Sequence, residues 1–229
     1  MKPSFTVAGV TFDTQAVYKG LIAYSNANSA GKLEGAVVKN GVLPHIKDEA
    51  ILKKHGNLFQ RFNDVAKKFD LPKQPRLGIS NYGYPFACTT AGGDIMMDGS
   101  MLKLFEPDEL DDILAHEFAH LELRHNHKGG KREQELAADE LAAERMGDSK
   151  GLRSGLHKID QFKEGLRNAS FRYRMLEGVG RVATSVSDAI ADKQTRCPTT
   201  YQRTDRLKKL DRSFATREKD EFGSERTNR

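Results

Sequence analysis

The chain has 229 residues, of which 38% are hydrophobic, so it is long enough for one sizeable core with appendages. It contains no apolar run that could span a bilayer, and its first residues lack the apolar stretch and cleavage site of a signal peptide. We therefore expect a soluble, cytoplasmic protein. The two cysteines, Cys88 and Cys197, are too few for a disulfide scaffold and are not spaced as a metal-binding pair.

The formal net charge is +5, and basic residues crowd the C-terminal third of the chain. A strongly basic surface would suit nucleic acid or a membrane as the partner. Here aspartate and glutamate are interleaved with lysine and arginine, a pattern that is typical of a solvated helix face. The charge pattern therefore makes nucleic acid an unlikely partner.

The pattern divides the chain into three parts. Residues 1–47 are predicted to be an accessory N-terminal segment, with a short strand pair around Gly9 and a helix at residues 17–24. Residues 48–211 are predicted to form the main domain. Residues 212–229 are polar, and most of them are predicted to be a disordered tail.

The main domain is predicted to be α+β, mostly helical, with a small mixed sheet next to one central helix. Apolar positions predict a single helix at residues 48–69, and we expect the lone His55 within it to lie on the surface. Strands are predicted at residues 76–80, 86–90 and 94–98, a turn or short helix at 99–105, and later helices at 132–145, 150–167, 170–192 and 199–214.

The central helix begins at Pro107, and acidic residues in its first turn complement the helix dipole. It carries the pattern His-Glu-x-x-His, with histidines at 116 and 120 and a glutamate at 117. Because residues four apart share one helix face, both imidazoles can reach one zinc ion. Glu117 lies on the adjoining face, where it can take a proton from water. The pattern predicts a zinc-dependent hydrolase.

A catalytic zinc ion needs three protein ligands and an open position. We predict Glu135 as the third ligand, because it lies early in a helix that can pack across the first one. Asp139 follows one turn later on the same face and is predicted to hydrogen-bond the distal nitrogen of a ligand histidine, His116 in our interpretation.

His125 and His127 are the rival third ligands. A metzincin would need glycine at position 123 and histidine at 126, where this chain has Leu123 and Asn126. We therefore expect both rival histidines to lie near the helix end, where positive charge is favourable.

These residues resemble the gluzincin-type zinc metallopeptidases that include the CAAX prenyl protease, the HtpX heat-shock protease and the soluble minigluzincins. The resemblance spans roughly residues 48–211, and the stretch from Glu135 to Asp139 fits the family pattern Glu-x-x-Ala-Asp. Further similar stretches lie at residues 92–97, 101–102, 108–110, 114–117 and 151–158. The resemblance implies a zincin-like fold, one zinc ion, and a peptide substrate that pairs with an edge strand within residues 86–98.

The family carries His-Pro, four residues and then Arg near its C-terminus, and its histidine is thought to stabilise the oxyanion. This chain keeps Arg203 but has Cys197 in place of that histidine. We predict that Arg203 or Tyr201 supplies the oxyanion donor instead. A thiolate is also a good zinc ligand, so Cys197 could hold the enzyme latent, although a small buried thiol is the simpler interpretation.

The leading prediction is a soluble zinc endopeptidase in which Glu117 is the general base and acid. One alternative is a regulatory peptidase linked to a DNA-binding repressor, whose glutamate helix has a similar pattern. Another is a zinc-stabilised interaction module with little catalysis, binding nucleic acid through its basic C-terminal helices.

Overall fold

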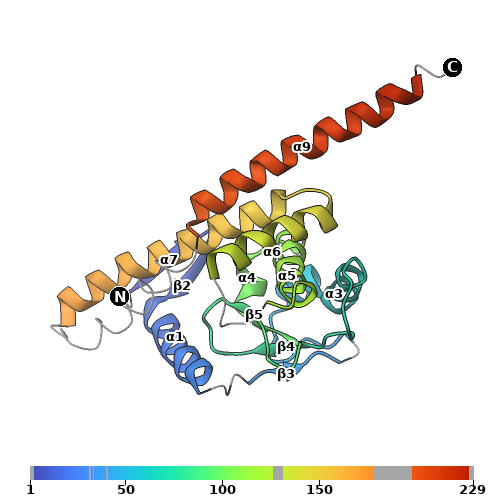
Figure 1. The fold of residues 1–229 in the computed structure, drawn as a ribbon. Helices are drawn as coiled ribbons and strands as arrows, with labels where there is room; N and C mark the ends of the chain where they lie inside the picture. Colours follow the sequence, from blue (N-terminus) through green and yellow to red (C-terminus); the bar gives the residue numbers. More distant parts are fainter. Residues whose placement is uncertain are drawn as a thin grey trace.

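The computed structural model describes residues 3–30, 32, 34–39, 41–125, 131–177 and 198–226. The fold is α+β and mostly helical, as predicted, with a small mixed sheet beside the central helix (Figure 1). Among the described residues, no helix combines the length and the apolar character needed to cross a membrane. The division into three sequence regions stays a prediction.

The chain alternates short strands with helices of very different lengths. The strands are β1 (Ser4–Val7), β2 (Val10–Asp13), β3 (Ala36–Val37), β4 (Leu77–Ser80), β5 (Ala87–Thr89) and β6 (Ile95–Asp98). The helices are α1 (Thr14–Ser29), α2 (Glu49–His55), α3 (Leu58–Ala66), α4 (Met101–Leu104), α5 (Pro107–Glu122), α6 (Lys131–Met146), α7 (Lys150–Glu177) and α9 (Thr200–Arg226).

Four strands form the main sheet in the order β3-β4-β6-β5. The pair β4–β6 is parallel and the other two pairs are antiparallel, so the sheet is mixed. Strand β5 therefore lies at one edge, and this edge strand contacts α5. The predicted strand pair around Gly9 is confirmed as β1–β2, whose two turn residues Ala8 and Gly9 both have positive φ, as a type I′ turn requires.

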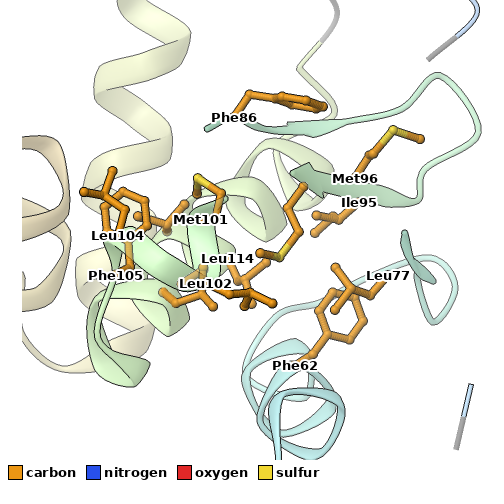
Figure 2. Close-up of a cluster of buried hydrophobic side chains, with 14 of the residues drawn as sticks. Phe62, Leu77, Phe86, Ile95, Met96, Met101, Leu102, Leu104, Phe105 and Leu114 are labelled. Carbon is orange, nitrogen blue, oxygen red and sulfur yellow. The ribbon is translucent and has the colours of Figure 1, made fainter. Parts of the chain in front are cut away.

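The core lies between the sheet, α3, α4 and α5. Figure 2 shows Phe62 of α3, Leu77 of β4, Ile95 of β6 and Leu114 of α5 within one buried cluster. Each of these four side chains has an exposed fraction of 1% or less. Because the inner face of the sheet packs on the apolar face of α5, the central helix is held in a close-packed environment.

The single helix predicted at residues 48–69 is wrong. The helix breaks at Gly56 and Asn57, and α2 then contacts α4 while α3 contacts α5. The surface position predicted for His55 is also wrong, because the side chain is fully buried. Burial, with the positive charges of Arg61 and Lys54, lowers the pKa of His55 to about 4, so the imidazole is neutral in the core.

The C-terminal helices are longer than predicted. The two helices predicted at residues 150–167 and 170–192 begin as one, α7, which continues to Glu177 because no proline or glycine interrupts residues 166–177. Helix α9 extends to Arg226, well beyond the predicted end at Phe214 (Figure 1). Residues 178–197 lie outside the described residues.

Helix α5 is anchored to α7 by two buried carboxylates near its N-terminus. Glu109 accepts hydrogen bonds from Lys158 Nζ at 2.6 Å and from Ser154 Oγ at 2.5 Å. Asp112 Oδ2 accepts from the Leu152 N–H at 2.9 Å, in the first turn of α7. The approach is close: a Cβ at Gly151 would lie 2.7 Å from Asp112 Oδ2. This contact fixes the orientation of the helix that carries the histidines.

The anchoring residue Asp112 makes stability depend on pH. Burial, and to a smaller extent neighbouring carboxylates, raise its pKa to about 7 in spite of the Leu152 N–H. The ionised form therefore opposes folding above pH 7, and the penalty fades as the pH falls towards the ordinary pKa of 3.8. Asp112→Asn keeps the accepting oxygen and removes the charge. We expect a higher free energy of unfolding than in the parent at pH 8, by about 1 kcal/mol or more.

Urea unfolding of the metal-free proteins at pH 4.5 and pH 8 measures this difference. The gain should shrink at the lower pH, and Asp160→Asn, at an exposed carboxyl on α7, is the control. A gain of equal size at both pH values would contradict the assignment.

Candidate metal centre

Two imidazoles meet on the inner face of α5, one helical turn apart. The rings of His116 and His120 have centroids 4.6 Å apart and are nearly perpendicular, and their Nε2 atoms are 3.1 Å apart. Both side chains are largely buried, because β5 and α6 pack against α5. The two nitrogens therefore point toward one common position.

Helix α6 brings a carboxylate to the same position. Glu135 has one oxygen 3.5 Å from His116 Nε2 and the other 3.7 Å from His120 Nε2. Small buried residues, Ala138 and Ala142, let α6 approach α5 closely enough for this contact. The three residues predicted from the sequence as ligands thus form the one cluster of possible metal ligands found in the described part of the chain.

The donor set fits a zinc ion. One atom from each of the three residues lies within 4.8 Å of the others, and two imidazoles with one carboxylate form a common donor set of catalytic zinc. Burial and the charge of His116 lower the pKa of His120 to about 3, which keeps this imidazole neutral, as a ligand must be. Burial opposes protonation of His116, but hydrogen bonds to Asp139 and Glu135 raise its pKa to about 10, so this imidazole would release a proton when zinc binds. Burial opposes ionisation of Glu135, but the contact with His116 and the positive charges of His116 and Arg203 together outweigh it and hold the pKa below its ordinary value.

A second carboxylate, that of Asp139, orients His116 through the ring nitrogen Nδ1, which faces away from Glu135. Asp139 is only 1% exposed, and its Oδ1 accepts a hydrogen bond from His116 Nδ1 at 2.9 Å. Arg203 of α9 donates to both oxygens of this carboxylate, at 2.7 Å from Nε and 2.6 Å from Nη2. Its Nη1 also lies 3.3 Å from Glu135. His116 is the histidine that Asp139 is predicted to contact, and the role of Asp139 in fixing a metal ligand stays a prediction.

The glutamate between the histidines is buried beside the edge strand. Glu117 accepts a hydrogen bond from Thr89 Oγ1 of β5 at 3.2 Å. Burial, opposed by the charge of His116, raises the pKa of Glu117 above its ordinary value. Sequence reasoning missed Thr89, because no local pattern shows that β5 lies against α5.

The other predicted residues are exposed, contact His120 on its Nδ1 side, or lie outside the described residues. The side chain of Tyr201 is 79% exposed, and its backbone carbonyl accepts from Thr204. His125 contacts His120, but on the Nδ1 side of the ring, at 2.8 Å, away from Glu135. Cys197 and His127 lie outside the described residues, so the latency prediction for Cys197 stays a prediction.

Comparison with known proteins gives one family match. No curated protein matches the chain. Residues 52–130 match the family model of Peptidase family M48, a range that contains α5 and its two histidines and ends before Glu135. M48 peptidases are zinc metalloproteases, and the match supports a metallopeptidase of this family. This part of the chain, which includes the two histidines of α5, is therefore similar to the M48 zinc metallopeptidases.

Proposed function

We propose that the protein is a zinc-dependent endopeptidase. The observation that carries the proposal is the convergence of His116, His120 and Glu135 on one position, with the buried carboxyl of Glu117 adjacent. Two histidines and a glutamate would hold one zinc ion and leave a position open. When bound, the ion would polarise the carbonyl of the peptide bond and lower the pKa of water.

Glu117 is the proposed general base and acid. Its carboxylate takes a proton from the attacking water and then delivers this proton to the leaving amine. Burial raises its pKa, so that Glu117 holds the proton better than an exposed glutamate would between the two steps. The hydroxyl of Thr89 binds one carboxylate oxygen and so limits the rotation of the side chain.

The edge strand β5 is the proposed substrate-binding element. It lies at the end of the sheet order and contacts α5, and its Thr89 reaches the catalytic glutamate. An extended peptide that adds to this edge would receive main-chain hydrogen bonds from β5. Its scissile bond would then lie beside Glu117.

Arg203 is proposed as a positioning residue. Its two hydrogen bonds to Asp139 neutralise a buried carboxylate, and this carboxylate in turn holds His116. The oxyanion donor stays a prediction for Arg203 or Tyr201. Of the two, Arg203 is supported by its nearness to Glu135, at 3.3 Å.

Removal of the Glu117 carboxylate tests the proposed mechanism. Glu117→Gln has nearly the same shape but cannot accept the proton, so we expect the rate of peptide cleavage to fall by about 10²- to 10⁴-fold. Zinc binding should be retained, because Glu117 is not a proposed ligand. A peptide-library or casein digest measures the rate, and Glu133→Gln, at an exposed glutamate of α6, is the control. Parent-like cleavage by Glu117→Gln would contradict the mechanism.

Removal of the metal, or of a ligand, tests the proposed centre. A chelator should abolish peptide cleavage, and added zinc should restore it. Glu135→Gln replaces the anionic ligand with a neutral amide, so it should bind zinc at least 10-fold more weakly than the parent, as measured by competition with a chromophoric chelator. Cleavage that persists after the zinc content has fallen to zero would contradict a zinc-dependent mechanism.

The positioning role of Arg203 predicts a large effect on stability. Arg203→Gln leaves the buried carboxylate of Asp139 without its cation, so we expect a loss of about 3–5 kcal/mol in the free energy of unfolding. Arg206 also pairs with an acid of α6, Glu140, but this pair is exposed. Arg206→Gln is therefore the matched control and should cost about 1 kcal/mol or less. Equal losses for the two variants in denaturant unfolding would argue against the role.

A further inference from the structure

The helix α5 ends in a cap that involves one of the proposed zinc ligands. Arg124 has φ +52°, the left-handed conformation, and its N–H donates to the Leu121 carbonyl at 3.1 Å. The N–H of His125 reaches back to the carbonyl of His120 at 3.0 Å. These two hydrogen bonds define a Schellman motif, with Arg124 as the left-handed residue and His125 just after it.

The cap brings two side chains together. In a Schellman motif the residue after the left-handed position commonly makes an apolar contact with the residue five positions earlier. In this chain those two residues are His125 and His120. Their ring centroids are 5.0 Å apart, and the two Nδ1 atoms are 2.8 Å apart.

The direction of this hydrogen bond follows from the metal centre. Because His120 Nε2 points toward His116 and Glu135, it must offer a lone pair there, and its proton therefore resides on Nδ1. Nδ1 of His120 then donates to Nδ1 of His125, which accepts. His116 has a comparable partner in Asp139, so each proposed ligand histidine is oriented by a hydrogen bond at its Nδ1 atom.

We propose that His125 is a positioning residue for the metal centre, which holds His120 in the tautomer and ring orientation that a zinc ion requires. The helix cap and the metal site are thus a single structural unit. His125 itself is not a ligand, since it approaches the ring of His120 on the side away from Glu135. This inference rests on the proposed zinc-peptidase function.

Three variants separate positioning from packing. His125→Leu keeps the apolar contact of the cap but removes the acceptor, so zinc should bind about 10- to 100-fold more weakly than to the parent. His125→Asn has an oxygen close to the place of Nδ1, and its affinity should return toward that of the parent. Arg124→Gly keeps the left-handed cap and should bind zinc as the parent does.

Affinity is measured by competition with a chromophoric chelator, and the unfolding temperature of each zinc-free protein reports the fold. We also expect the Nδ1 proton of His120 to be protected in NMR spectra of the zinc-bound parent and of His125→Asn, and to exchange rapidly in His125→Leu. Parent-like affinity in His125→Leu, or equal losses in the Leu and Asn variants, would overturn the assignment of His125. Absence of zinc binding by the parent would instead contradict the proposed metal centre.

Discussion

The proposed metal centre depends on the buried carboxylate of Asp139. Removing a carboxylate from water is costly unless hydrogen bonds and an opposite charge compensate for it. Here Arg203 of α9 and His116 of α5 both donate to the carboxylate, which itself belongs to α6. One interaction thus joins three helices and orients a proposed ligand. Loss of the Arg203 side chain would leave this carboxylate without its cation and would weaken its hold on His116.

The packing around α5 makes this arrangement rigid. The helix is buried against the sheet on one side and is anchored to α7 through Glu109 and Asp112 near its N-terminus. At its other end the cap formed by Arg124 and His125 closes the helix directly behind His120. A site with fixed ligand positions needs less rearrangement when it binds a metal or a substrate, because the ordering has already taken place during folding.

The parts of this site that sequence could predict are those that depend on local periodicity. The spacing of His116 and His120, and that of Glu135 and Asp139, are both one helical turn, so each pair must share a helix face. The role of Arg203 beside Asp139 could not be predicted in this way, since 64 residues separate the two. The burial of His55 could not be predicted for a related reason. The chain breaks at Gly56 and α2 packs with His55 toward the core, a tertiary contact that sequence periodicity does not show.

The hydrogen-bond partners of His116 and His120 differ in charge, and this difference is consistent with a net charge of zero at the zinc-bound site. His116 donates to a carboxylate, whereas His120 donates to a neutral imidazole in the arrangement proposed here. The two positive charges of a zinc ion and the one of Arg203 would equal the negative charges of Glu135, Asp139 and an ionised Glu117. A carboxylate at position 125 would add an uncompensated negative charge and oppose ionisation of the general base. A neutral acceptor behind His120 fixes the ring without raising the pKa of Glu117 further.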